Sequence, residues 1–237
     1  MLSIVCPVYN EADNIERLLN ELQNKVSIPA EVLIVYDHEE DNTIPVVSSI
    51  ADRYSFEVKL VKNKFGTGAL NAIKTGFTEA RHEAVLVVMA DLSDDLGAVD
   101  EMYRLIMDEG YDVVCGSRYM KGGRQLGGPF LKRLLSRMAG VSLHYLTGIP
   151  THDVTNSFKM YRRSFLMNTK IESEGGFEIG MELTVKAFIS GLKITELPVT
   201  WTDRVAGKSR FQMWPWILNY LRWYFYAFKK FAKKRTV

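Results

Sequence analysis

A chain of 237 residues, with 47% hydrophobic and 24% charged residues, is long enough for one large α/β domain of ordinary globular composition. Its net charge of +2 is too close to zero to indicate a nucleic-acid or membrane partner. We expect no nucleic-acid partner. The two cysteines, Cys6 and Cys115, are expected to be buried, reduced thiols, as in a cytosolic protein. The first residues show no basic segment followed by a long apolar run, so we expect no signal peptide.

The first half of the chain alternates predicted strands with predicted helices. Short apolar runs predict strands, over residues 2–6, 31–36, 56–61, 85–89 and 112–115. Apolar residues at helical spacing separate them, and either Asn10 or Asp13 is expected to cap the first helix. This βαβ spacing predicts an α/β fold with a doubly wound, Rossmann-like, mostly parallel sheet flanked by helices.

The second half is less regular. We expect a helix from residue 130 to about 146, and another within residues 174–191 that ends at Gly191. A further strand is expected over residues 193–199. Two glycine-bearing basic loops, over residues 121–129 and 203–211, complete this half.

An acidic cluster follows the buried strand over residues 85–89. Asp91, Asp94 and Asp95 come directly after it, and Asp37 ends the strand over residues 31–36. The carboxyl ends of parallel strands meet at one sheet edge, where open α/β sheets bind ligands. Oxygen ligands suit Mg²⁺ or Mn²⁺, which could bridge to a substrate phosphate. The alternative is a solvated turn in which Asp94 or Asp95 caps the next helix.

The end of the chain is aromatic and basic. Residues 214–235 are rich in Trp, Tyr and Phe and finish in a cluster of Lys and Arg, but Asn219 and Arg222 interrupt the run, so it cannot span a bilayer. Aromatic residues favour the membrane interface, and each cation near an anionic leaflet is worth about 1 kcal/mol. We therefore expect residues 212–237 to form an amphipathic helix, distinct from a domain over residues 1–211, that contacts the membrane peripherally. The alternative is a helix packed on its own domain or on the partner in a homodimer.

Seven segments with recognisable motifs occur along the chain up to about residue 211. They are VCPVYNEADNI, EVLIVYD, KFGTGALNAIKTGF, the stretch ending in Asp91, VVCGSRY, HDVTNSFKMYRR, and the run from ITELPVTW to DRVAGKSRF. In this order they resemble glycosyltransferase family 2, which has the GT-A fold. Within that family the dolichyl-phosphate (polyprenyl-phosphate) mannosyltransferases are the most similar group.

The resemblance implies roles for particular residues. The residues implied to bind the nucleotide are Pro7, Tyr9, Glu11, Asp37, Gly66 and Ala69. Mg²⁺ or Mn²⁺ would be held by Asp91 first, with Asp94 and Asp95 as further candidates. The catalytic candidates are Asp91, Arg118 and Arg204. The acceptor phosphate would be bound by Arg204, Lys208, Ser209 and Arg210. Asp153 is expected either behind the site or in an acceptor-binding loop, and the alternative is a helix or turn cap.

The resemblance also implies an activity. It is the inverting transfer of a mannose- or glucose-type sugar from a GDP- or UDP-sugar to a polyprenyl or dolichyl phosphate, at the cytoplasmic face of a membrane. Two positions depart from the family's pattern: Met89 stands where its metal motif has a first Asp, and HEEDNT follows Asp37 where a Gly-Ser pair is usual. Two alternatives remain open. One is a glycosyltransferase with a glycan or lipid-headgroup acceptor, and the other, motivated by Met89, is a non-catalytic nucleotide-sugar-binding module.

Overall fold

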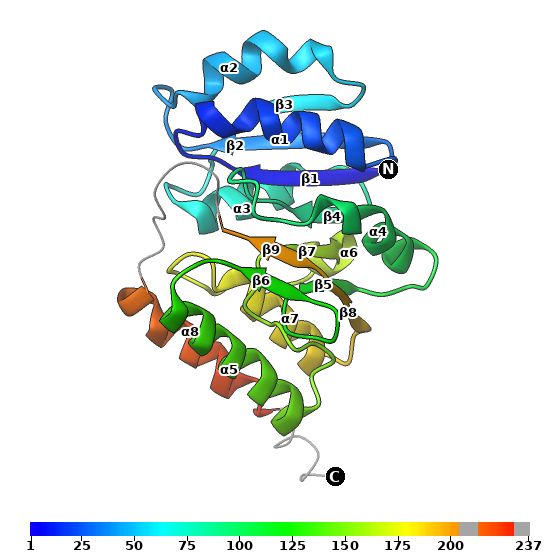
Figure 1. The fold of residues 1–237 in the computed structure, drawn as a ribbon, viewed down its shortest axis with the longest axis vertical. Coiled ribbons are helices and arrows are strands. Elements are labelled where there is room, and N and C mark those ends of the chain that lie inside the picture. Colours follow the sequence, from blue (N-terminus) through cyan, green and yellow to red (C-terminus); the bar gives the residue numbers. More distant parts are fainter. Residues whose placement is uncertain (204–212, 230–237) are drawn as a thin grey trace.

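The computed structural model describes residues 1–203 and 213–229, in which helices cover both faces of a central sheet (Figure 1). In this part of the chain the sheet has seven strands in the spatial order β3–β2–β1–β4–β7–β5–β8. In chain order they are β1 (Leu2–Pro7), β2 (Ala30–Tyr36), β3 (Glu57–Lys62), β4 (Ala84–Val87), β5 (Val113–Ser117), β7 (Lys159–Arg162) and β8 (Ile194–Pro198). A separate parallel pair is formed by β6 (Arg124–Leu126) and β9 (Thr200–Thr202).

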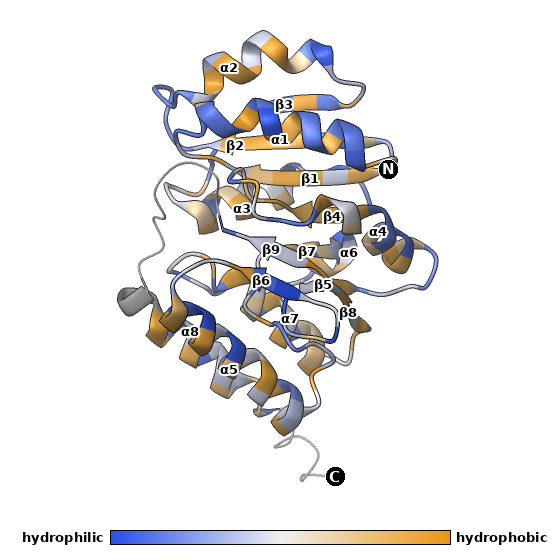
Figure 2. Ribbon diagram, in the orientation of Figure 1, coloured by the Kyte–Doolittle hydropathy of each residue, from blue (hydrophilic) through white to orange (hydrophobic). Residues whose placement is uncertain are grey.

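The sheet separates two hydrophobic cores. The helices are α1 (Ala12–Lys25), α2 (Thr43–Ile50), α3 (Ala69–Glu79), α4 (Val99–Met107), α5 (Phe130–Thr147), α6 (Arg163–Met167), α7 (Ile179–Ile189) and α8 (Met213–Tyr226). Side chains alternate along a strand, so Ile4 and Cys6 of β1 face α1, α2 and α4, while Val5 faces the core shared by α3, α5, α6, α7 and α8. Figure 2 shows apolar strands β1 and β2 beside α1, which carries many polar residues, and numerous apolar residues along α5 and α8.

The predicted mostly parallel sheet is confirmed, with one exception. Strand β7 lies between β4 and β5 and runs antiparallel to both, whereas β1, β2, β3 and β4 pair in parallel, as do β5 and β8. Its sequence, KMYR, carries two cations and gives no apolar run. Lys159 is nevertheless fully buried, because its ammonium donates hydrogen bonds to the main-chain carbonyls of Val154 and Asn156. A strand that buries a lysine in this way cannot be recognised by hydropathy.

The start of α1 corrects the predicted cap. Neither Asn10 nor Asp13 caps it, and Glu11 precedes its first residue without a side-chain cap of its own. Instead the amide of Ala12 donates to Asn42 Oδ1 at 3.2 Å. The amide of Glu11 donates to the hydroxyl of Thr43 at 2.9 Å. Asn42 and the first residue of α2, Thr43, therefore bind the amides at the start of α1 and tie the start of α2 to the end of β1.

Helix α8 packs on its own domain through one face. Trp223 and Ala227 are buried in the core shared with α7, and the indole of Trp223 donates to the hydroxyl of Ser173 at 3.1 Å. Packing on the domain was one of the alternatives for this segment. The predicted domain boundary at residues 211 and 212 lies outside the described residues. Among the residues described, no helix combines the length and apolar character needed to cross a bilayer.

Candidate active site

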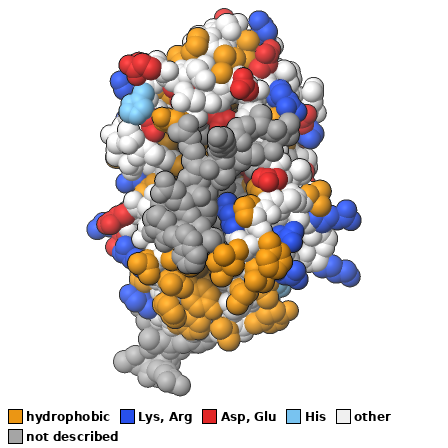
Figure 3. Space-filling model, turned by 60° about the vertical axis from the view of Figure 1, so that its left-hand side comes forward, with side chains coloured by type: hydrophobic (Ala, Val, Ile, Leu, Met, Phe, Trp, Pro, Cys, Tyr) orange, Lys and Arg blue, Asp and Glu red, His pale blue; other side chains and the backbone are white. Residues whose placement is uncertain are grey.

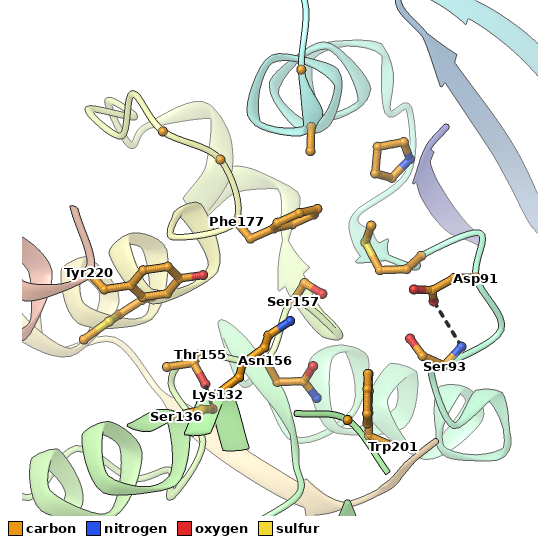
Figure 4. A pocket seen from close by; sticks show the side chains of 18 of the residues that line it. Asp91, Ser93, Lys132, Ser136, Thr155, Asn156, Ser157, Phe177, Trp201 and Tyr220 are labelled. Carbon is orange, nitrogen blue, oxygen red and sulfur yellow. Dashed lines mark hydrogen bonds between the residues drawn. The ribbon is translucent and has the colours of Figure 1, made fainter. Parts of the chain in front are cut away.

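A cavity of about 740 Å³ lies beside the carboxyl ends of β1, β2 and β4 (Figure 4). One part of its wall comes from these strand ends and from the start of α3, and comprises Pro7, Tyr9, Glu11, Asp37, Gly68, Ala69 and Asp91. Another part comes from α5, α7 and α8 and is mainly apolar, with Leu135, Ala139, Met181, Ile217, Leu221 and Tyr224. The cavity therefore joins a polar region at the sheet edge to an apolar region between helices, which suits a ligand pair of mixed polarity.

The loop after β4 presents one carboxylate to the cavity. Strand β4 ends at Val87, so Met89 already belongs to the loop. Asp91 Oδ1 accepts a hydrogen bond from the amide of Ser93 at 3.2 Å, and both side chains line the cavity (Figure 4). Leu92 between them has φ of 61°, a left-handed conformation that non-glycine residues rarely adopt. Strained backbone of this kind is common at functional sites.

Asp94 and Asp95 brace this loop and do not line the cavity. Asp94 Oδ2 accepts a hydrogen bond from the amide of Met89 at 2.9 Å, and Asp95 Oδ2 accepts one from the amide of Thr200 at 3.0 Å. Burial raises the pKa of Asp94 to about 7; the bond from Met89 opposes this rise and the charge of Asp91 adds to it. Of the three carboxylates predicted to hold a metal, the structure brings only Asp91 into the cavity wall.

Asp37 holds the glycine loop in place at the end of β2. Its two carboxylate oxygens accept hydrogen bonds from the side-chain amide of Asn63 and from the backbone amide of Gly68, both at 2.9 Å. Gly68 has φ of 102°, which a residue with a side chain would adopt only under strain. Gly66, the glycine expected at the nucleotide, is not part of the cavity wall, whereas Gly68 and Ala69 are.

Arg118 lines the cavity, but its charge is already paired. Its guanidinium binds Asp153 bidentately, with Nε–Oδ2 at 2.6 Å and Nη2–Oδ1 at 2.9 Å. It also donates to the hydroxyls of Ser136 and Thr155, both at 3.1 Å. Burial alone would raise the pKa of Asp153, but the guanidinium holds it below its usual value. Arg118 therefore organises the cavity wall and offers a ligand only part of its charge.

Two features of the cavity were not predicted from the sequence. Lys132 reaches into it from α5, with Tyr220 on one side and Asp91 on the other (Figure 4). Lys132 and Ser136 are four residues apart, so they share the inner face of that helix, and this spacing was the available signal. Phe177 enters from the loop before α7, whose Gly175 and Gly176 amides both donate to the buried carboxylate of Glu178. No motif marked this loop.

The family model described as glycosyl transferase family 2 matches residues 3–169, more than half of the chain. The chain belongs to glycosyl transferase family 2. Among its relatives, a polyprenol monophosphomannose synthase from Mycolicibacterium smegmatis is 28% identical over 213 residues, 87% of this chain and 79% of the relative. A dolichol-phosphate mannosyltransferase from Pyrococcus furiosus is 29% identical over 226 residues, 93% of this chain but only 62% of the relative.

Solved structures with the same fold support the GT-A assignment. Glucosyl-3-phosphoglycerate synthase from Mycobacterium tuberculosis, in complex with Mn²⁺, UDP and glucosyl-3-phosphoglycerate, gives a TM-score of 0.68 at 14% identity, over 97% of this chain and 79% of that chain. S. aureus TarS in complex with UDP gives a TM-score of 0.61 at 20% identity, over 85% of this chain and 60% of that chain. The resemblance inferred from the motifs is thus confirmed, and the protein is a glycosyltransferase with the GT-A fold.

The Mycobacterium tuberculosis enzyme was crystallised with UDP and Mn²⁺. The residues of this family 2 site could hold such a cation only together with a substrate phosphate. No group of three or more His, Cys, Asp or Glu side chains in residues 1–203 and 213–229 is placed to hold a metal. Mg²⁺, however, commonly keeps its waters and binds one or two carboxylates together with substrate phosphates. Asp91 supplies one such carboxylate in the cavity wall, where Met89 also lies. The residues therefore fit a cation that the protein and a diphosphate hold jointly.

The basic loop of this glycosyltransferase was predicted to bind the acceptor phosphate. Its candidates, Arg204, Lys208, Ser209 and Arg210, lie outside the described residues. Their assignment stays a prediction from the sequence.

Proposed function

We propose that this glycosyltransferase moves a mannose- or glucose-type sugar from a GDP- or UDP-sugar to a polyprenyl or dolichyl phosphate, at the cytoplasmic face of a membrane. One observation carries the proposal. The cavity combines a polar wall of strand ends with an apolar wall of helices, and Lys132 lies between Tyr220 and Asp91 (Figure 4). A nucleotide diphosphate requires the first wall, an isoprenoid chain the second, and an acceptor phosphate a cation between them. The names of the two relatives support the same acceptor class.

The donor binds at the sheet edge in this proposal. Pro7, Tyr9 and Glu11 contact the nucleotide, and Asp37 keeps the glycine loop in the shape that receives it. Asp91 would hold Mg²⁺ or Mn²⁺, and the cation would supply positive charge against the charge that develops on the departing diphosphate. Asp94 and Asp95 contribute by fixing the loop that presents Asp91.

The acceptor phosphate binds on the α5 side. A phosphate is already ionised at neutral pH, so it needs cations to orient it and no strong general base. Lys132 provides an ammonium on the inner face of α5, with the hydroxyls of Ser136 and Thr155 beside Arg118. Arg204, Lys208, Ser209 and Arg210 are further candidates from the sequence. Direct attack on the anomeric carbon from this side displaces the diphosphate and inverts the configuration.

The test is a transfer assay with GDP-mannose, UDP-glucose and a short polyprenyl phosphate, with and without Mn²⁺. Lys132→Met should raise the acceptor KM about 10- to 100-fold, because a hydrogen bond to a charged group is worth about 1.5–3 kcal/mol. It should leave donor binding unchanged. Arg133→Met is the matched control, since Arg133 stacks on Phe130 and does not line the cavity. An Asp91→Ala protein with full activity would refute the role of Asp91.

Met89 is the one observation that favours the second candidate function, a non-catalytic nucleotide-sugar-binding module. It lines the cavity where the family pattern has a carboxylate, so the cation has one protein ligand fewer. Binding of a nucleoside diphosphate without turnover of any donor would favour a binding module. Met89→Asp should then create Mn²⁺-dependent turnover, whereas in an active enzyme it should mainly lower the Mn²⁺ concentration required.

A further inference from the structure

Exposed apolar side chains are concentrated on two helices. Of the fifteen large hydrophobic residues most exposed in the described part of the chain, nine belong to α5 and α8. We call these nine the α5–α8 outer surface: Phe130, Leu131, Leu134, Met138, Tyr145, Leu146, Leu218, Leu221 and Phe225. Figure 3 shows a broad apolar area on the lower part of the molecule, where α5 and α8 lie in Figure 1. The two helices are joined by a hydrogen bond of 2.9 Å between the hydroxyls of Ser142 and Tyr224.

This arrangement differs from an ordinary surface helix. The inner face of α5 lines the cavity and packs on the domain, with Ser136 in the cavity wall and Leu143 fully buried. The opposite face of a surface helix is normally polar. Here it carries Phe130 at 67% and Met138 at 57% exposure, and α8 adds Leu218 at 72%. Apolar areas of this kind on a folded protein mark an interaction site.

The charged side chains carried by α5 and α8 are all cations. The sequence contains no Asp or Glu between Asp112 and Asp153, although six Lys or Arg residues lie there, and none after Asp203. Arg137 on α5 and Arg222 on α8 are exposed beside the apolar side chains. An anionic leaflet attracts such cations, whereas a second copy of this chain would bring them against one another. The charge thus selects an anionic lipid surface as the occupant.

The same surface leads into the cavity. Leu221 is 41% exposed on the outer surface and also lines the cavity. Its neighbours on the inner side of α8, Ile217 and Tyr224, continue the apolar wall. Lys132, which directly follows the outer residue Leu131 on α5 and stands two residues before Leu134, also lines the cavity. A lipid with its phosphate near Lys132 therefore has an apolar path out past Leu221.

We propose that the α5–α8 outer surface inserts into the headgroup region of an anionic bilayer, and that the lipid acceptor passes sideways from the leaflet into the cavity past Leu221. The membrane contact then belongs to α5 as much as to the end of the chain. Insertion is independent of the activity, whereas the entry path rests on the proposed function.

Vesicle binding tests the insertion. The full chain is sedimented with vesicles of phosphatidylcholine alone or mixed with phosphatidylglycerol. Wild type should bind the mixed vesicles, and the double variant Leu134→Glu/Met138→Glu should bind them about tenfold more weakly or less, because it places charges in the apolar layer. The matched control Met107→Glu/Met167→Glu changes two exposed methionines on α4 and α6 and should bind like wild type.

Three results would overturn the insertion. One is undiminished vesicle binding by the double variant on α5. A second is equal binding to neutral and anionic vesicles, since each cation should contribute about fivefold on an anionic leaflet. The third is a wild-type dimer in light scattering that the double variant converts to a monomer with unchanged vesicle binding, which would assign the surface to a second copy. If the double variant fails to fold, Arg133→Gln/Arg137→Gln replaces it and should lower binding to anionic vesicles about 25-fold.

Transfer assays test the entry path separately. The double variant on α5 should keep transfer to a short, water-soluble polyprenyl phosphate and lose most transfer to a long-chain polyprenyl phosphate embedded in vesicles. Lateral entry would be overturned if the double variant lost transfer activity equally with both acceptors, or if it lost none with either acceptor. If the proposed function itself is wrong, wild type transfers to neither acceptor while vesicle binding persists, so the two failures are distinguishable.

Discussion

The buried pair of Arg118 and Asp153 gives a sharp prediction for Asp153→Asn. This substitution keeps the shape of the side chain and removes its charge. The carboxylate is fully buried, binds the guanidinium at 2.6 and 2.9 Å, and also accepts hydrogen bonds from Thr155 and Asn156. An amide has a single acceptor oxygen, so it cannot accept the hydrogen bonds of Arg118 together with those of Thr155 and Asn156. The arginine charge then stays buried without a counter-charge.

Breaking one side of a buried ion pair costs about 3–5 kcal/mol, a large share of the roughly 5–15 kcal/mol that stabilises a typical protein. Urea unfolding at pH 7 measures this loss. Glu101→Gln serves as a control, because the Arg104–Glu101 pair is solvent-exposed and removing it should cost about 0–1 kcal/mol. A change of less than 1 kcal/mol for Asp153→Asn would refute the role given to the pair.

The pH dependence follows from the lowered pKa of Asp153, where the effect of Arg118 outweighs that of burial. The free carboxyl titrates near 3.8, and the folded one lower. The stability that the pair contributes is therefore fully present above about pH 4 and is lost as the pH falls through the folded pKa. The gap in unfolding free energy between wild type and Asp153→Asn should accordingly narrow below about pH 4. A gap that stays constant down to pH 2.5 would contradict the assignment.

Three further predictions concern other parts of the molecule. The folded pKa of Asp94 lies near 7 against 3.8 in the free carboxyl, so the stability that this carboxyl contributes should be lost as the pH rises from about 4 to 7; urea unfolding in EDTA should show Asp94→Asn gaining on wild type over that range. Gly76→Ala would place its Cβ 2.1 Å from a methyl of Val5, and thermal unfolding should show a loss of about 1–3 kcal/mol despite the better helix propensity of alanine. Trp223→Ala removes the buried indole that bonds Ser173 and should cost about 3–5 kcal/mol in the same measurement; a change under 1 kcal/mol would show that α8 is not held by this face.

The sequence predicts the framework of the sheet well, because β1, β2 and β4 are apolar on both faces and are separated by helices of regular spacing. It predicts the acidic loop after β4, and the resemblance makes Asp91 the first metal candidate, but nothing in the sequence shows that Asp94 and Asp95 stay out of the cavity wall. Their orientation depends on the left-handed backbone of Leu92 and on the amide of Thr200, which is more than a hundred residues away and binds Asp95. Neither leaves a local signal in the sequence.

Lys132 illustrates a second limit. The helix that contains it was predicted with almost the observed ends, 130–146 against Phe130–Thr147. A helix with apolar residues on its outer side as well gives no indication of which face turns toward the protein. Only the packing of Leu143 into the core assigns Lys132 and Ser136 to the cavity.

The position of α8 has a practical consequence for handling the protein. The sequence suggests an appendage that could be trimmed near residue 211, yet Ile217, Tyr220, Leu221 and Tyr224 form part of the cavity wall. A shortened chain would keep the strand ends and the loop of Asp91, but it would lack the α8 part of the apolar wall that is proposed to bind the lipid acceptor. The polar wall expected to bind the nucleotide would remain in any such fragment that folds, so a nucleotide-binding screen alone would not reveal the loss of the α8 part of the cavity wall.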